Sequence, residues 1–339
     1  MNIVFDGNYL IHKCFSVWAT YYQDRKATPE ENDEAIRLAL EDKEKQQVLL
    51  RKILIDFCAA VNRFKPLGID SVVVVLDSMS WRYNFYPNYK YALTKVKSSY
   101  YQGFLNIINI FEEFLRKKGI IVSRVQGAEG DDLIYTWSVY FNETQEEEVI
   151  VITADSDLRQ IINPKLSIFC NNSKNLRMYC HGCNEVRWNE YFDVDVLVDK
   201  VEPLEIVLYK VIMGDNSDNI PKLKKGFGNV AFGKFIKSIT PYWIAEHVTV
   251  LEMGQIIAKW FCNFLNITDL QEYADMLGKI LFNLQMTWLN LSVYNADNFL
   301  YENGKSLLEN MLQDVSDQCD KYSYNKDYSL EELYGLMIK

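Results

Sequence analysis

The sequence predicts an α/β fold built on a mostly parallel sheet. Four short apolar runs lack polar alternation, which is typical of strands that are buried on both faces: residues 2–5, 71–76, 120–125 and 148–153. Longer segments with helical periodicity separate these runs. Acidic residues follow each run within a few positions. Because the carboxyl ends of parallel strands meet at one sheet edge, where α/β proteins bind ligands, we expect these acids to gather there.

Length and composition indicate a folded intracellular protein. The chain has 339 residues and 49% hydrophobic content, enough for one large domain or two ordinary ones. It opens on a strand-like run without a charged leader, and no apolar run is long enough to span a bilayer. Seven scattered cysteines do not indicate a disulfide framework. We therefore expect a cytoplasmic protein that does not enter membranes.

The remaining elements are expected to be largely helical. Residues 24–52 form a charge-rich helical pattern opened by Thr28, and residues 53–64 become amphipathic enough to pack on a sheet. Residues 165–179 predict a hairpin and residues 201–213 a helix. Beyond residue 240 the pattern is mostly helical and rich in aromatic and aliphatic side chains, without a charged cluster. That region indicates packing or partner binding rather than chemistry.

Acidic side chains predict a divalent-metal site at the expected sheet edge. The aspartates and one glutamate of this group lie just past strands or at the start of a helix: Asp6, Asp77, Glu129, Asp131, Asp132, Asp155 and Asp157. Asp6 alone would also fit a helix cap, and acids in a first helical turn are favourable through the helix dipole. Carboxylates this close, however, cannot all remain ionised in an interior unless cations neutralise them.

The segment after Asp77 mixes cations with aromatic rings. Arg82 and Lys90 alternate with residues such as Trp81 and Tyr89. One interpretation is a packed aromatic helix pair with solvated lysines. The other is a segment over the active site whose cations grip phosphate while its rings stack on unpaired bases.

A second acidic pair precedes a lysine-rich turn. Asp215 and Asp218 follow the helix at 201–213, and five lysines lie between residues 222 and 237 with no acid among them. Gly226 and Gly228 can present backbone N–H groups to a phosphate. The net charge of -10 alone argues against nucleic acid as a partner, but a local basic patch can bind phosphate on an acidic protein.

In this order, the motifs resemble those of the 5′-nuclease or flap endonuclease superfamily, and most of all its phage branch, which includes phage ribonuclease H and phage 5′-3′ exonucleases. The likeness covers about residues 1–240. It implies a PIN-like nuclease core at 1–213 with a mostly parallel sheet flanked by helices and a helical arch at about 79–118. It further implies a helix-three-turn-helix module at 214–240, followed by a helical C-terminal extension at 241–339.

The resemblance also assigns roles to individual residues. A first Mg²⁺ would be held by Asp6, Asp77, Glu129, Asp131 and Asp155, and a second by Asp132, Asp157, Asp215 and Asp218. Mn²⁺ can substitute for either ion. Arg82 and Lys90 would meet the scissile phosphate, with Tyr89 stacking on a nucleotide. Nucleic acid would contact Lys224, Lys225, Gly226, Gly228 and Lys234, with K⁺ bound at the glycine turn.

The expected function is that of a structure-specific 5′-nuclease, acting as a 5′-3′ exonuclease and flap endonuclease by a two-metal mechanism. Its substrates would be DNA with 5′ flaps or RNA–DNA hybrids, cut to remove RNA primers during replication. We expect a monomer that works beside replication proteins such as a single-strand-binding protein, in the host cytoplasm if phage-encoded. Two alternatives are a PIN-type nuclease for single-stranded RNA and a non-catalytic protein that binds DNA junctions.

Overall fold

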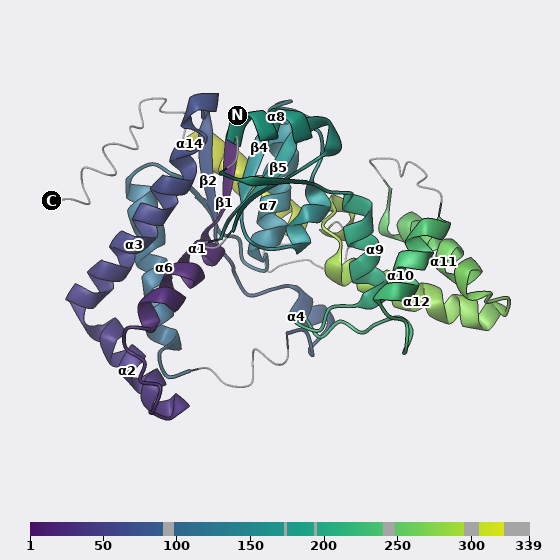
Figure 1. The fold of residues 1–339 in the computed structure, drawn as a ribbon, viewed down its shortest axis with the longest axis horizontal. Coiled ribbons are helices and arrows are strands. Elements are labelled where there is room, and N and C mark those ends of the chain that lie inside the picture. Colours follow the sequence, from purple (N-terminus) through teal and green to yellow (C-terminus); the bar gives the residue numbers. More distant parts are fainter. Residues whose placement is uncertain (91–97, 173–174, 193–194, 240–247, 295–304, 322–339) are drawn as a thin grey trace.

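The fold is centred on a seven-stranded sheet of order β3-β2-β1-β4-β5-β6-β7 (Figure 1). The computed structural model describes residues 1–90, 98–172, 175–192, 195–239, 248–294 and 305–321. Adjacent strands are parallel except for the β5–β6 hairpin. The strands are β1 Asn2–Asp6, β2 Ser71–Val75, β3 Ile121–Ser123, β4 Val149–Ile152, β5 Leu166–Asn172, β6 Asn175–Cys180 and β7 Leu197–Lys200.

The four predicted parallel strands are confirmed and lie side by side as β3, β2, β1 and β4. Every residue of β1 and of β4 is buried, which explains why their sequences are apolar without alternation. The predicted hairpin is also confirmed as β5 and β6. Strand β7 was not predicted, because this edge strand is half exposed and its sequence, LVDK, contains no apolar run.

Helices cover both faces of the sheet. On one face Ile3 and Phe5 pack with apolar residues of α1, α3 and α6, whereas Val4 points to the other face and packs with α7, α9 and α14. The helices are α1 Gly7–Ala19, α2 Pro29–Glu41, α3 Lys43–Asn62, α4 Arg82–Phe85, α6 Tyr101–Lys117, α7 Gly130–Val139, α8 Glu185–Phe192, α9 Pro203–Met213, α10 Asn229–Ser238, α11 Val250–Leu265, α12 Leu270–Thr287, α13 Leu291–Tyr294 and α14 Leu307–Lys321. Shorter helical turns are η1 Lys65–Leu67, η2 Tyr140–Thr144, η3 Asp157–Ile161 and η4 Gly182–Asn184.

The charge-rich segment predicted as one helical stretch forms two helices. Thr28 caps α2 in a capping box with Glu31, as its sequence indicated. Asp42 leaves the helical conformation at φ -80° and ψ 116°, and its side chain accepts hydrogen bonds from the backbone N–H groups of Glu44 and Lys45. This one residue therefore ends α2 and begins α3.

The C-terminal helices pack into the same apolar core as the sheet. Phe261, Ile280 and Met311 belong to one buried cluster with Val4. Helices α9 and α10 are joined by turns at 214–228, where the helix-three-turn-helix module is expected; that module stays a prediction. Residues 91–97 of the expected arch, and residues 240–247, 295–304 and 322–339, lie outside the described residues. The division into regions 1–213, 214–240 and 241–339 stays a prediction.

None of the helices within the described ranges combines the length and the apolar character needed to cross a bilayer.

Candidate metal centre and nucleic-acid interface

A polar cleft of about 210 Å³ opens at the carboxyl edge of the sheet. Several elements distant in sequence supply its walls: the start of α7, the turn after β4, the loop after α9, and the segment that follows α4. The predicted site residues that line it are Arg82, Tyr89, Lys90, Glu129, Asp131, Asp155, Asp157 and Asp218. The expected gathering of acids at one sheet edge is thus what the fold produces.

Asp6 is both a helix cap and a member of the acidic cluster. One carboxylate oxygen accepts a hydrogen bond from the backbone N–H of Tyr9 at 2.9 Å, which caps α1. The other accepts from the hydroxyl of Thr153 at 2.8 Å, which ties β1 to the end of β4. Burial raises the pKa of Asp6 to about 7, and the nearby charges of Asp77 and Asp155 add to the shift. Asp6 therefore caps α1 and also lies close to the other acids of the cluster.

A glycine places the start of α7 against Asp77. The backbone N–H of Gly130 donates to Asp77 Oδ1 at 2.6 Å, and a Cβ at position 130 would lie 2.9 Å from that same oxygen. The amide of Asn8 donates to Asp77 Oδ2 at 2.7 Å. The glycine between Glu129 and Asp131 is thus required for close approach, a function that the sequence reasoning missed.

Asp131 and Asp155 are repelled by other carboxylates of the cluster. Burial raises the pKa of Asp131 well above its usual range, and the charges of Asp155, Asp6 and Glu129 raise it further. The pKa of Asp155 is also raised, through desolvation in the cleft and the adjacent Asp157, although its side chain reaches solvent. These groups need a positive partner to remain ionised together.

Glu129 is held by several donors. Burial alone would raise its pKa, but the charges of Arg82 and Lys90, with hydrogen bonds from Lys90 and Tyr89, lower it to about 2. Arg82 Nη1 donates to Glu129 Oε2 at 2.7 Å, and Lys90 Nζ donates to Oε1 at 2.5 Å. Glu129 is therefore ionised at neutral pH and is held in place at the N-terminus of α7.

Two predicted roles are corrected by burial, those of Asp132 as a metal ligand and of Arg82 as a phosphate contact. Asp132 is 0% exposed, and its oxygens accept from Arg82, the hydroxyl of Tyr294 at 2.9 Å and the backbone N–H of Glu129 at 3.0 Å. Arg82 is 3% exposed and also donates to the carbonyl of Met286 at 3.0 Å. Arg82 and Asp132 are bonded to each other and support Glu129 from beneath, so their charged groups are already engaged within the protein.

The role of Tyr89 is corrected as well. Its side chain is 2% exposed, so its ring is not available to stack on a nucleotide. The hydroxyl donates to Glu129 Oε2 at 2.9 Å and lies 3.3 Å from Asp218 Oδ2. Tyr89 therefore positions two carboxylates that sit on different elements.

Lys210 is a site residue that the sequence reasoning missed. Its ammonium lies 2.6 Å from Asp157 and also donates to Asp215. Ser217 donates to the other oxygen of Asp215 through its backbone N–H at 2.8 Å and through its hydroxyl. The signal was a single lysine in the otherwise apolar second half of α9, IVLYKVIM.

Asp218 completes the far wall of the cleft. Burial raises its pKa to about 6; the charge of Lys90 opposes that shift, and Asp215 and Glu129 reinforce it. The ammonium of Lys90 lies 3.9 Å from Asp218 Oδ1, so it bridges this aspartate and Glu129.

The donor set fits hard divalent cations. Carboxylate oxygens are the ligands that Mg²⁺ and Mn²⁺ prefer. Burial and mutual repulsion raise the pKa values of Asp6 and Asp131, and a nearby positive charge would favour their ionised forms. Within the described residues, no three acidic, histidine or cysteine side chains already converge on one point. The ammonium groups of Lys90 and Lys210 instead hold Glu129, Asp157 and Asp215 in separate pairs. An ion would have to draw these oxygens together.

The predicted nucleic-acid contacts lie on one loop and the helix after it. Lys224, Lys225 and Lys234 are exposed. Gly226 has a φ of +81°, and Gly228 is the N-cap of α10. Exposed lysines next to a glycine turn are the arrangement that phosphate binding requires, so these contacts stay a prediction with the expected geometry.

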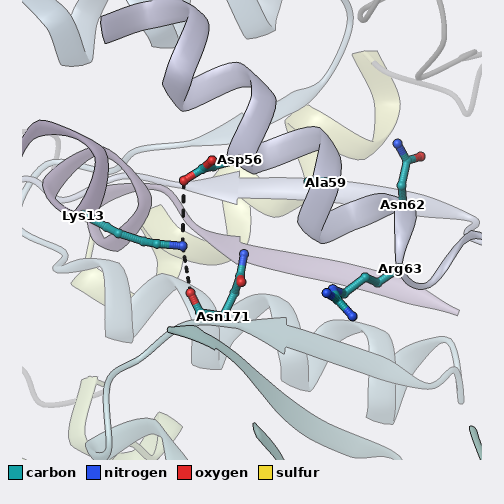
Figure 2. Close-up of a pocket in the computed structure, with 6 residues that line it drawn as sticks. All are labelled: Lys13, Asp56, Ala59, Asn62, Arg63 and Asn171. Carbon is teal, nitrogen blue, oxygen red and sulfur yellow. Dashed lines mark hydrogen bonds and ion pairs between the residues drawn. The ribbon is translucent and has the colours of Figure 1, made fainter. Parts of the chain in front are cut away.

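A second cavity lacks the chemistry of the first. A pocket of about 440 Å³ lies between α1, α3 and the end of β5. Figure 2 shows the residues that line it. Lys13 Nζ donates to the carbonyl of Asn171 at 2.8 Å and lies 3.8 Å from Asp56 (Figure 2). Asp56 also lies 3.6 Å from Lys52. One carboxylate beside two lysines cannot hold a divalent ion, so the cleft at the sheet edge is the candidate site.

The comparison with protein families matches residues 2–187 to the model described as "5′-3′ exonuclease, N-terminal resolvase-like domain". The 5′-3′ exonuclease of Buchnera aphidicola subsp. Acyrthosiphon pisum is 28% identical over 167 residues, which is 48% of this chain and 52% of that protein. The 5′-3′ exonuclease of Mycoplasmopsis pulmonis is 24% identical over 221 residues, covering 64% of this chain and 60% of that protein. The match thus spans less than two thirds of the length of each of these curated relatives.

Solved structures show the same fold. The bacteriophage T5 flap endonuclease, in a complex with DNA and metal ions, aligns with a TM-score of 0.53 and 16% identity, covering 94% of this chain and 99% of that chain. The T5 5′-exonuclease with bound zinc aligns with a TM-score of 0.53, covering 99% and 100%. The PIN-like fold expected from the resemblance is therefore confirmed.

Proposed function

Because the chain belongs to the family of 5′-3′ exonucleases, whose N-terminal domain matches residues 2–187, we propose that it is a metal-dependent nuclease acting at 5′ single-strand-to-duplex junctions. The observation that carries the proposal is the convergence of carboxylates from three separate segments on one cleft. Asp6 and Asp77, which follow two further strands, lie close enough for their charges to act on Asp131, and the pKa values of Asp6 and Asp131 are raised. Relatives named 5′-3′ exonuclease and the DNA complex of the T5 flap endonuclease support it.

The cleft would hold two Mg²⁺ or Mn²⁺ ions. One would bind among Asp6, Asp77, Glu129, Asp131 and Asp155, and the other among Asp157, Asp215 and Asp218. Bound ions of this kind lower the pKa of a water nucleophile and stabilise the leaving oxygen of a phosphodiester. The protein supplies the fixed positions of the oxygens, through Thr153 at Asp6 and the backbone of Gly130 at Asp77.

Lys90 is the cation that would meet the substrate. Its side chain is 28% exposed, whereas that of Arg82, which also lines the cleft, is 4% exposed. Its backbone is held at φ +49°, an uncommon conformation for lysine, by a hydrogen bond from its N–H to the carbonyl of Asp218 at 3.1 Å. A cation fixed in this way would stabilise the charge that develops on a phosphate during cleavage.

The loop that carries Lys224 and Lys225, called the lysine loop below, would anchor the duplex beside the cleft. Lys224, Lys225 and Lys234 would contact backbone phosphates, while Gly226 and Gly228 would leave room for a phosphate and a K⁺ ion. Its proposed role is the removal of RNA primers from DNA during replication. It would act in the cytoplasm as a monomer, beside a single-strand-binding protein. If the protein is phage-encoded, that cytoplasm is the host's.

One panel of substrates tests this function. We would incubate the protein with Mg²⁺ and a labelled 5′ flap, a nicked duplex, an RNA-primed duplex and a single-stranded RNA. The proposal predicts cleavage of the junction substrates and little cleavage of the single strand. Cleavage of single-stranded RNA alone would instead identify a PIN-type ribonuclease. Tight junction binding without cleavage would identify a non-catalytic binding protein.

A further inference from the structure

A groove of about 580 Å³ lies between the loop after α9 and the exposed side of α12. Lys222 stands on the loop wall and Lys279 on the helix wall, and both side chains are exposed. The groove is separate from the carboxylate cleft, since the two share no lining residue. The sequence motifs assigned no role to α12.

The charge of the groove is opposite to that of the whole chain. Within the described part of the chain, neither Lys222 nor Lys279 forms an ion pair with an acidic side chain, and the groove contains one carboxylate, Asp275, which accepts from Gln271 at 2.9 Å. The lining is therefore net positive on a protein whose formal charge is -10. Lys222 also continues directly into the exposed Lys224 and Lys225, so the groove extends the lysine loop.

Gly278 leaves the floor of the groove open. It lies in the interior of α12, where glycine costs about 1 kcal/mol relative to alanine. Internal packing does not require it, because a Cβ at this position would meet nothing within 4 Å. A missing side chain on an exposed helix surface allows another backbone to approach closely. The position therefore favours a close-lying partner over an internal contact.

The two walls are fixed to each other. Asn283 is 1% exposed, and its side-chain amide donates to the carbonyls of Val211 at 2.7 Å and Pro221 at 2.9 Å. These bonds tie α12 to the end of α9 and to the loop that carries Lys222. The backbone positions that carry the two lysines are thus fixed relative to each other before any ligand arrives, which reduces the entropic cost of binding.

We propose that this groove binds the sugar–phosphate backbone of the substrate duplex and extends the lysine loop onto α12. The inference rests on the proposed function and names an additional contact surface for the same substrate. Two lysines on opposite walls would straddle one strand, and the bare surface at Gly278 would let that strand reach the helix. The contact is sequence-independent, because it involves only backbone phosphates.

Two variants and one control test the groove. We would measure the dissociation constant for a 5′-flap DNA with a long duplex, at several salt concentrations, for the wild type, Lys279→Glu and Gly278→Leu. The control is Lys165→Glu, which makes the same charge change at an exposed lysine that precedes β5, at the opposite edge of the sheet from the cleft. Melting temperatures accompany every affinity.

Lys279→Glu is expected to weaken binding about tenfold and to reduce the slope of log K against log salt by about 1. Gly278→Leu is expected to weaken binding while the melting temperature stays the same or rises, since leucine is the better helix former. Equal affinities for Lys279→Glu and Lys165→Glu would overturn the inference. So would a Gly278→Leu protein that binds as tightly as the wild type.

The same measurements separate this inference from the proposed function. A wild type that binds and cleaves flap DNA, with groove variants that behave like the control, overturns the groove alone. A wild type that binds the duplex through the groove but does not cleave it overturns the nuclease and supports the groove. A wild type that binds no duplex overturns both.

Discussion

Replacing Lys210 by methionine should destabilise the protein mainly when no divalent metal is present. Its ammonium lies between Asp157 and Asp215, which would otherwise face each other without a cation. The lysine side chain is 17% exposed, Asp157 26% and Asp215 8%, so solvent screens this group only in part. Methionine preserves the length and apolar stem of the side chain and removes the charge.

The expected loss follows from the cost of leaving buried charges unpaired. Removing one partner of a fully buried ion pair costs about 3–5 kcal/mol. Because Asp157 retains some contact with water, we expect a loss of about 2–3 kcal/mol in the free energy of unfolding in EDTA. Bound Mg²⁺ would replace the missing charge, so the loss should shrink to about 1 kcal/mol or less at saturating Mg²⁺.

Urea denaturation with and without Mg²⁺ measures this difference. Lys13→Met is a matched control, because Lys13 is a partly buried lysine, with 21% of its side chain exposed, and lies beside a single aspartate away from the cleft (Figure 2). Its effect should be the same in EDTA and in Mg²⁺. If Lys210→Met loses equal stability in both conditions, Lys210 is a structural residue and does not share its carboxylates with a metal ion.

Three further predictions concern the rest of the cleft. Arg82→Met should lower the free energy of unfolding by about 3–5 kcal/mol in urea denaturation, because it leaves Asp132 buried and unpaired; a loss below about 1 kcal/mol would contradict the buried pair. Gly130→Ala should weaken Mg²⁺ binding in calorimetry while circular dichroism stays unchanged, since its methyl group would press on Asp77; unchanged affinity would refute the close approach. Mg²⁺ binding at pH 6 should release protons, because the pKa of Asp6 is raised to about 7 by burial, and calorimetry in buffers of different ionisation enthalpy would show it.

The sign of the pH effect on stability follows from the same pKa. The folded state holds a proton on Asp6 more tightly than the unfolded chain does. The free energy of unfolding of the metal-free protein should therefore fall as the pH rises from about 4 to about 7. Saturating Mg²⁺ should flatten that dependence, and a dependence of the opposite sign would contradict the buried cluster.

Much of the fold could be predicted because buried parallel strands leave a clear sequence signal. The runs around Val4, Val73, Ile121 and Val151 are apolar on both faces, and all four form parallel strands, which lie side by side in the sheet. Strand β7 leaves no such signal, since one edge of it is solvent-exposed. The boundary at Asp42 was missed because the charges on both sides of it are equally helical.

The composition of the site was predictable, but the roles within it were not. A sequence shows which acids follow strands, and Asp6, Asp77 and Asp155 lie where that pattern put them. It does not show how deeply each side chain is buried. Asp131 faces the cleft, whereas the next residue, Asp132, points into the core and is bonded to Arg82. Lys210 was overlooked because its partners, Asp157 and Asp215, meet it only after the fold brings two segments together.

The most direct test of the metal centre is cleavage of a 5′-labelled flap in Mg²⁺ by the wild type and by Asp131→Asn. Asp131 lines the cleft, and the charges of four other acids of the cluster act on it. Replacing its carboxylate by the amide of asparagine should therefore reduce turnover by at least a hundredfold while the fold is preserved. Asp199→Asn on the edge strand β7 should leave turnover unchanged. Wild-type turnover by Asp131→Asn would contradict a metal centre built on these carboxylates.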